Sequence, residues 1–288
     1  MSIFAESSPY IYIRMEKYAE YLQKIEIDQL WSGRRSIEWT LDRKVNILSG
    51  VNGVGKSTII NKIVRSIGHD GELCASGGGG VRLDACPADA TRIRYDIIRS
   101  FDRPLLSAEI LAEIGPRLMT ELDLQLFKLQ RKYLDYQVNV GNRIIATLQA
   151  GGDGAAERAQ RMSEAKRKFQ DILDDLFSET GKKVIRTENE IRFTQMGETL
   201  YPYNLSSGEK QMLVILLTVL VQDGRDYVLF MDEPEASLHI EWQKRMIDLI
   251  LELNPNVQVI LATHSPAVVM NGWIGNITEV SDIVTANP

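Results

Sequence analysis

The chain has 288 residues, of which 44% are hydrophobic, and its formal net charge at pH 7 is -6. This balance excludes a generally basic nucleic-acid-binding protein, although a local basic patch stays open. No apolar run reaches membrane-spanning length, and the first residues lack the basic and apolar regions of a secretory signal. Cys74 and Cys86 are too few for a disulfide framework or a zinc site, so we expect a cytoplasmic protein with free thiols.

The first 48 residues predict mainly extended structure. Residues 1–22 carry tyrosines among charges and predict either a strand followed by a short helix or an N-terminal arm. Alternating apolar residues at 25–28 and 37–41, and the apolar run 45–48, predict a β-meander. The turn between the first two strands carries an aromatic residue and two cations, Trp31, Arg34 and Arg35.

Residues 50–57 read GVNGVGKS and fit the phosphate-binding pattern G-x-x-x-x-G-K-[ST]. The glycines permit a tight turn whose N–H groups point into one concavity, and the helix that begins at Lys56 adds the positive end of its dipole. Lys56 can reach the β- and γ-phosphates, and the Ser57 hydroxyl can bind Mg²⁺. The residues expected to contact a nucleotide here are Asn52, Gly53, Val54, Gly55, Lys56, Ser57 and Thr58.

The middle of the chain predicts a helical hairpin. Residues 76–80, SGGGG, predict a flexible loop, and 92–98 predict a strand. From residue 105 apolar residues recur at helical spacing, Gly115-Pro116 divides the run, and the second helix continues to about residue 150. After a reversal at 151–154 a charged helix returns over 155–177. We therefore expect residues 105–180 to be inserted into an α/β domain made of 1–104 and 181–288, whose strands resume at 184–186 and 191–193.

The cations of this hairpin allow two interpretations. They are interspersed with acids, which favours a solvated helix face with ion pairs between neighbouring turns, but they could also form a surface that contacts DNA or a partner. These cations are Arg131, Lys132, Arg143, Arg158, Arg161, Lys166, Arg167 and Lys168.

The second half of the chain adds acids and a histidine. Residues 205–211, LSSGEKQ, precede an apolar helix, and their serines and glycine predict a second anion-binding helix start. An apolar strand at 227–231 ends in Asp232 and Glu233, placed to hold Mg²⁺ through water and to deprotonate an attacking water. A further buried strand, 257–261, precedes His264, which we expect at the same sheet edge, in contact with the γ-phosphate.

In this order the motifs GVNGVGKS, LSSGEKQ, VLFMDEPEASLH and ATHSP resemble those of an ABC-type ATPase over roughly residues 25–280. The LSSGEKQ wording and the helical insertion resemble the RecF-like, SMC-like and overcoming-lysogenization-defect branch. EPEASLHIEWQ and ATHSP are also similar to the small ATPase subunits of anti-phage systems such as Septu, PARIS and retrons. The implied fold is an ABC-ATPase head, a mixed β-sheet with a P-loop core, carrying an inserted helical hairpin.

The resemblance implies ATP and Mg²⁺ as ligands and a head-to-tail homodimer, with higher oligomers open. Ser207 and Gly208 of one copy would contact the γ-phosphate that is bound by Lys56 of the other. Asp232, Glu233 and His264 would act on the nucleotide within their own copy, and hydrolysis at Glu233 would open the dimer.

Two departures from the family pattern stand out. The usual glutamine after the strand that follows the P-loop is missing, since no Gln lies between residues 61 and 120. Ser100 or Asp102 could take its place, and turnover is then expected to be slow. No clear aromatic platform for adenine follows from the motifs, so Arg34, Arg35 or Trp31 could supply contacts to the adenine or ribose.

The leading function hypothesis is an ATP-switched sensor or scaffold in phage defence or DNA metabolism. The chain ends about 24 residues after His264, so we expect any nuclease to be a separate subunit. The alternatives are a RecF-like DNA clamp or repair ATPase without an effector, and the nucleotide-binding subunit of a transporter. The hairpin, the LSSGEKQ wording and the missing glutamine argue against the transporter, and a membrane is not expected as a partner.

Overall fold

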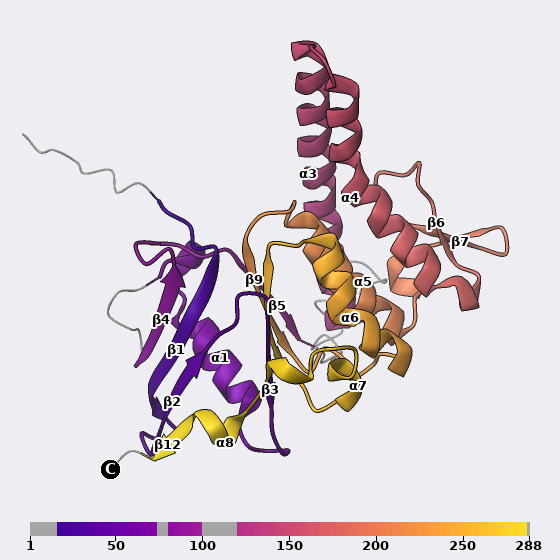
Figure 1. Cartoon of the computed structure of the whole chain (residues 1–288). Coiled ribbons are helices and arrows are strands. Elements are labelled where there is room, and N and C mark those ends of the chain that lie inside the picture. The colour runs from indigo at the N-terminus through magenta and orange to yellow at the C-terminus, as the bar shows by residue number, and fades with distance from the viewer. Residues whose placement is uncertain (1–15, 74–79, 100–119, 287–288) are drawn as a thin grey trace, which may run out of the picture.

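The computed structural model describes residues 16–73, 80–99 and 120–286, and Figure 1 shows their arrangement. Several predictions fall outside these residues: most of the SGGGG loop, the helix before Gly115-Pro116, the first 15 residues, and Ser100 and Asp102. Within the described residues, no helix combines the length and the apolar character needed to cross a membrane.

A five-stranded parallel sheet forms the centre of the molecule. Its order is β11-β3-β10-β9-β5, with β3 at Val45–Ser49, β5 at Tyr95–Arg99, β9 at Tyr227–Asp232, β10 at Val257–Ala262 and β11 at Ile277–Glu279. All four pairings are parallel, so the carboxyl ends of the strands meet at one edge. The strands read as continuous apolar runs because both faces of the sheet are covered.

A second, antiparallel sheet packs beside it, in the order β12-β2-β1-β4. Its strands are β1 (Tyr21–Leu30), β2 (Arg35–Thr40), β4 (Val81–Cys86) and β12 (Val284–Ala286). The predicted meander is wrong in its third strand, because β3 leaves β1 and β2 and pairs with β10 and β11 instead. The sequence analysis did not predict β4, which pairs along most of β1.

Helix α1 (Lys56–Ser66) lies between the two sheets, as Figure 1 shows. Its Ile59 and Ile63 are fully buried in one core cluster with Trp39 of β2 and Phe230 of β9. The opposite face of the parallel sheet, represented by Met231, belongs to the second cluster. Neighbouring residues of β9 therefore point into different cores, which is the side-chain alternation of a strand.

The second core is covered by helices α5 (Ser207–Val221) and α6 (Ile240–Leu253), on which the predicted hairpin stands. Its arms are α3 (Glu121–Ala150) and α4 (Ala155–Leu176), and their outer halves project from the head in Figure 1. A capping box between Thr120 and Asp123 starts α3. The predicted reversal at 151–154 is the turn between the arms.

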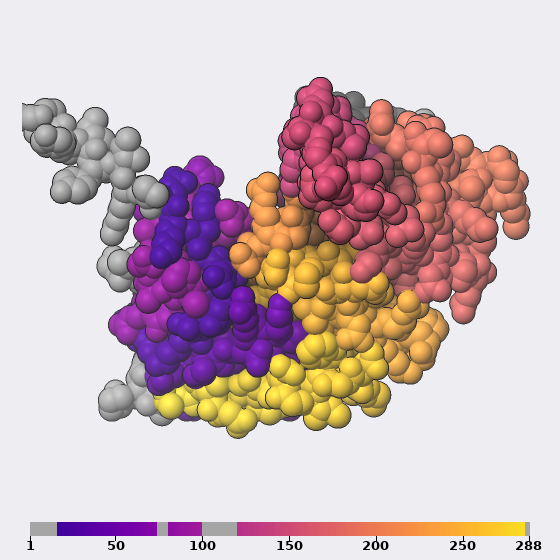
Figure 2. Space-filling model, turned by 45° about the horizontal axis from the view of Figure 1, so that its top comes forward, coloured from indigo at the N-terminus to yellow at the C-terminus, as the bar shows by residue number. Residues whose placement is uncertain are grey.

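The strands after the hairpin do not rejoin the central sheet as the sequence suggested. They form a separate small antiparallel sheet of β6 (Lys183–Val184), β7 (Phe193–Gln195) and β8 (Glu198–Leu200). The chain then returns through α5, β9, α6 and β10 to the short helices α7 (Pro266–Val269) and α8 (Val280–Ile283). Figure 2 shows the last residues, in yellow, running along one side of the head toward the antiparallel sheet, where β12 pairs with β2.

Candidate functional site

The carboxyl edge of the parallel sheet brings the predicted residues together. The P-loop follows β3, Asp232 is the last residue of β9, and His264 comes two residues after the end of β10. Asp232 is in register with Ala262, so the two strands end side by side. Ligands of open α/β sheets bind at this edge.

The P-loop has the backbone of an anion cradle. Gly53 and Gly55 have φ angles of 81° and 98°, which L side chains rarely adopt. Gly55 is the N-cap of α1, and no side chain caps the helix there. The first N–H groups of the helix are therefore left for a ligand, and the helix dipole favours an anionic one.

Lys56 is buried at the floor of this loop, where its side chain reaches back along the chain. Its Nζ donates to the Gly50 carbonyl at 2.8 Å and lies 3.2 Å from His264 Nδ1. Burial lowers the pKa of Lys56, and the nearby carboxylates of Glu233 and Asp232 oppose that shift. The ammonium is held next to the place where phosphate oxygens would lie.

Ser57 and Asp232 face each other across the sheet edge. The Ser57 hydroxyl donates to Asp232 Oδ1 at 2.9 Å, and Asp232 is almost fully buried. Burial raises the pKa of Asp232, and the Ser57 hydrogen bond only partly offsets this. A hydroxyl and a carboxylate are hard oxygen ligands, so Ser57 and Asp232 together fit the Mg²⁺ that the sequence predicts.

His264 connects Lys56 to Glu233. An ammonium can only donate, so the contact from Lys56 makes Nδ1 of His264 the acceptor and leaves the hydrogen on Nε2. That Nε2 lies 3.2 Å from Glu233 Oε1. Glu233 has a φ of 49°, a strained conformation for a glutamate, and its N–H donates to the Ala262 carbonyl at 2.8 Å. The strained backbone holds this carboxylate at the sheet edge.

Glu235 is a part of the site that the sequence analysis missed. It is 6% exposed, and its Oε1 accepts hydrogen bonds from the Thr263 hydroxyl and, at 3.1 Å, from the His264 N–H. Glu235 therefore fixes the backbone that carries His264. The signal in the sequence was a third acid in MDEPE, but its partners lie about 28 residues away.

Of the three candidates for a base contact, the structure brings Trp31 to the P-loop. The Trp31 ring lies so close to Gly55 that a Cβ on this glycine would collide with it. The ring remains 38% exposed. Arg34 and Arg35 are exposed, and Arg35 is held by backbone pairing with Leu30 and Ala286.

The LSSGEKQ segment begins α5. Ser206 is the N-cap in a capping box with Glu209, while Ser206 and Ser207 are exposed to solvent. A Cβ on Gly208 would lie 2.5 Å from the Ser237 carbonyl oxygen, so only glycine fits there. Within residues 16–73, 80–99 and 120–286, no hydrogen bond or ion pair joins this segment to the P-loop.

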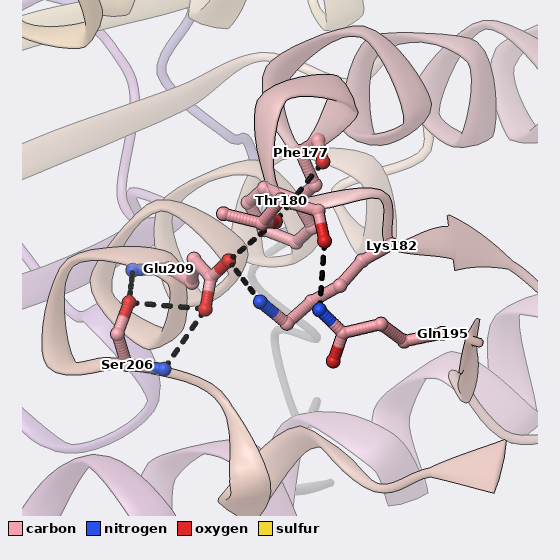
Figure 3. Close-up of polar contacts among 6 residues, drawn as sticks. All are labelled: Phe177, Thr180, Lys182, Gln195, Ser206 and Glu209. Atoms are coloured by element: carbon pink, nitrogen blue, oxygen red, sulfur yellow. Dashed lines mark hydrogen bonds and ion pairs between the residues drawn. The ribbon is translucent and has the colours of Figure 1, made fainter. Parts of the chain in front are cut away.

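Two buried ion pairs tie the start of α5 to the base of the hairpin. Glu209 accepts from Lys182 at 2.9 Å and from the Thr180 hydroxyl at 3.2 Å, just beyond α4 (Figure 3). The next residue, Lys210, lies 2.8 Å from Asp123 at the start of α3. Consecutive residues of the LSSGEKQ segment are thus bonded to opposite arms of the hairpin, an arrangement that the sequence did not indicate.

The missing glutamine has no described substitute. β5 ends at Arg99, in register with Asp232, and the chain that follows lies outside the described residues. Arg99 donates to Asn61 of α1 at 2.8 Å. Its positive charge also acts to lower the pKa of Asp232, against the larger effect of burial.

The hairpin cations pair with the head more than with neighbouring turns. Lys132 lies 3.7 Å from Asp96, Lys168 lies 3.6 Å from Glu252, and Arg143 forms two hydrogen bonds with Asp223. These contacts join the arms to the sheet and the helices below. The interpretation as a solvated face with pairs between adjacent turns therefore does not describe these three cations.

Comparisons with known proteins find one matching family model and several partly similar relatives. A family model described as an AAA domain, putative AbiEii toxin, Type IV TA system, matches residues 148–271. The Septu protein PtuA of Bacillus thuringiensis is 24% identical, over 89% of this chain and 74% of that protein. A probable ATPase of retron Vc95 from Vibrio cholerae is 33% identical over 98 residues, which are 30% of this chain and 19% of that protein.

Two further comparisons give a short sequence match and a structural superposition. The phosphate import ATP-binding protein PstB of Thermococcus kodakarensis is 40% identical over 67 residues, 23% of this chain, and the match spans only 25% of that protein. Among solved structures, an SMC head bound to the C-winged helix domain of ScpA superimposes with a TM-score of 0.51 and 16% identity, over 93% of this chain and 97% of that one. This superposition shows the fold of an SMC head.

Proposed function

We propose that this chain, which has the fold of an SMC head, is an ABC-type ATPase and works as an ATP-switched dimer that controls a separate effector subunit. The similarity to PtuA of the Septu system and to a retron ATPase supports a role in anti-phage defence, with DNA metabolism as the wider class. A nuclease is the effector that we expect.

One observation carries the proposal: the machinery for the γ-phosphate is divided. Lys56, Asp232, Glu233 and His264 meet at the sheet edge, whereas Ser207 is the exposed first residue of α5, a mostly buried helix that is bonded to the hairpin base. The first N–H groups of a helix have no partner within it, and Ser206 caps only that of Glu209, so the N–H groups of Ser207 and Gly208 could bind an anion. A second copy placed head to tail would supply that anion as the γ-phosphate of its own ATP.

Each residue then has a role in hydrolysis. The P-loop N–H groups and Lys56 would hold the phosphates, and Ser57 and Asp232 would hold Mg²⁺, which neutralises charge on the β- and γ-oxygens. Glu233 would orient and deprotonate the attacking water. His264, which is hydrogen-bonded to Lys56 and has its Nε2 3.2 Å from Glu233 Oε1, would position the Glu233 carboxylate and sense the γ-phosphate.

The switch would reach the effector through the hairpin. Because Glu209 and Lys210 are bonded to opposite arms, closing the dimer on Ser207 would also pull on the bases of α3 and α4. Hydrolysis would release that force when the dimer opens.

The Glu233→Gln variant tests this function. The amide cannot accept the proton of water but keeps the size of the side chain, so we expect a stable dimer in ATP and Mg²⁺, measured by sedimentation, with little phosphate release. Lys56→Ala should stay monomeric under the same conditions. If Glu233→Gln hydrolyses ATP at the wild-type rate, Glu233 is not the base.

A second assay tests the separate effector. The purified chain, with Mg²⁺ or Mn²⁺, should not cleave DNA. Robust cleavage that persists in Glu233→Gln would mean that this chain carries the nuclease itself and would refute the division of labour.

A further inference from the structure

Helix α3 carries two apolar seams, and within residues 16–73, 80–99 and 120–286 only one of them is covered. The buried seam has alternating spacings of four and three residues and packs in the core with α4 and α5: Leu122, Leu126, Leu129, Tyr133, Tyr136 and Val140. The second seam has the same spacing on another face: Phe127, Arg131, Leu134, Val138, Gly141, Ile145 and Leu148. This spacing is the heptad repeat by which one helix packs against another.

The second seam faces solvent. Each of its first four positions lies two residues before a position of the buried seam, which corresponds to about 200° around the helix. Phe127, Val138, Ile145 and Leu148 are 46%, 60%, 53% and 51% exposed. Leu134 is half-buried. Four large apolar side chains in one heptad register are more than the single exposed residues that any surface carries.

The other arm of the hairpin provides an internal comparison. The exposed face of α4 carries Glu157, Arg161, Glu164 and Arg167, as expected for a helix in water. Over residues 136–152, by contrast, α3 and the turn carry one charge, Arg143, and Asp223 of the head neutralises it. The two arms project from the head together in Figure 1, so both have the same surroundings. The difference in charge between α3 and α4 therefore needs another explanation.

Gly141 marks the place of closest approach. Glycine is among the poorest helix formers, and nothing lies within 4 Å of the position that a Cβ would take there. The fold of this chain therefore does not require glycine at this position. A second helix crossing here could come closer to the α3 backbone than at any residue with a side chain.

The charges beside the seam decide what kind of helix fits. At the end near the head, Lys128 and Arg131 are exposed, and Arg131 lies over the Phe127 ring, whereas Lys132 is paired with Asp96 of the head. A second copy of α3 would place cations on cations if parallel. If antiparallel, it would offer them the segment 142–150, whose one charged residue is the cation Arg143. An acidic helix satisfies them.

We propose that the second seam of α3 is a docking surface for an amphipathic helix of another protein, with a heptad apolar repeat and acidic residues at the end that meets Phe127. Resting on the proposed function, this helix belongs to the separate effector subunit. The hairpin that is bonded to the LSSGEKQ segment would then also hold the effector.

A synthetic peptide of about four heptads tests the surface directly. It carries leucine and isoleucine at the heptad positions and glutamates around one end, and a counterpart carries lysines there. Its binding to the full chain is measured by fluorescence anisotropy without nucleotide. We expect the glutamate peptide to bind about tenfold more tightly than the lysine peptide, because only glutamates pair with Lys128 and Arg131.

The double variant Val138→Glu/Ile145→Glu should weaken the glutamate peptide by about tenfold or more, because it places charges in the seam. The matched control, Gln160→Glu/Ser163→Glu, adds the same charges to the exposed face of α4 and should bind like the wild type. Both variants should give the wild-type circular-dichroism spectrum and melting temperature, which shows that they are folded without relying on the proposed switch.

Three results would overturn the proposal. Equal binding by the seam variant and the wild type would place the peptide elsewhere. Absence of binding to the wild type would show that the seam does not accept such a helix. A nucleotide-free dimer that sediments as such in the wild type but not in Val138→Glu/Ile145→Glu would identify a second copy as the occupant.

Discussion

The ion pair between Glu209 and Lys182 gives the sharpest stability prediction. The two side chains are 5% and 12% exposed, and Glu209 also accepts bonds from the Ser206 N–H and hydroxyl at 2.9 and 3.0 Å. Removing one partner of a buried pair costs about 3–5 kcal/mol, since the other charge stays buried. Lys182 keeps some access to water, so we expect Glu209→Ala to lower the free energy of unfolding by about 3 kcal/mol.

The measurement is urea unfolding of Glu209→Ala against a surface control. Glu241 forms an ion pair of similar length with Lys244, 2.7 Å, but its side chain is 61% exposed. Glu241→Ala should cost at most about 0.5 kcal/mol. If Glu209→Ala costs no more than this control, the pair does not hold the start of α5 and our account of the hairpin base is wrong.

The pH dependence adds a second signature. Burial alone would raise the pKa of Glu209, but Lys182 and the Ser206 bonds outweigh it and hold the pKa below its ordinary 4.5. The stabilisation is therefore fully present above pH 4.5 and is lost as the pH falls through the lowered pKa. The difference between wild type and Glu209→Ala should narrow below pH 4.5, and a constant difference would contradict the assignment.

The remaining predictions concern the nucleotide site. Asp232→Asn removes a carboxylate whose pKa is raised by burial, so the ligand-free variant should unfold at a higher temperature than the wild type at neutral pH. In this variant Mg²⁺ should no longer strengthen ATP binding. Calorimetry measures the melting temperature and nucleotide titration measures the Mg²⁺ effect, and a lower melting temperature would contradict the stability prediction. If the Trp31 ring stacks on adenine, Trp31→Ala should weaken ATP binding about tenfold and leave the binding of inorganic triphosphate unchanged. The loss of ATP affinity should exceed that caused by Arg34→Ala.

The parts of the structure that were predicted well from the sequence depend on local sequence signals. The glycines and Lys56 of the P-loop, the apolar strand ending in Asp232 and the GGDG turn each act within a few residues. Pairing over long separations decided the rest. β3 belongs to the parallel sheet because β10, more than 200 residues later, covers its edge, and no local pattern indicates this partner.

The same distinction holds within the site. Lys56 and Asp232 were predicted from motifs, and their places at the sheet edge follow from strand order. Three contacts depend on how separate segments meet: that of Trp31 with Gly55, the hydrogen bond from the His264 N–H to Glu235, and the ion pair of Lys182 with Glu209. These contacts could be found only in the structure, because nothing in the sequence distinguishes these residues from ordinary surface or turn residues.

The central claim is that two copies complete one ATP site, and mixing two inactive variants tests it most directly. Lys56→Ala destroys the phosphate grip, and Ser207→Arg blocks an exposed residue at the start of α5. A mixed dimer has one site built from the intact Lys56 of one copy and the intact Ser207 of the other. An equimolar mixture should therefore recover between about a quarter and a half of wild-type ATPase activity: each mixed dimer has one whole site of two, and mixed dimers are half of all dimers if the variants assort freely and all of them if neither variant dimerises alone. Absence of recovery, with both variants folded, would show that Ser207 serves the nucleotide of its own copy and would contradict the claim.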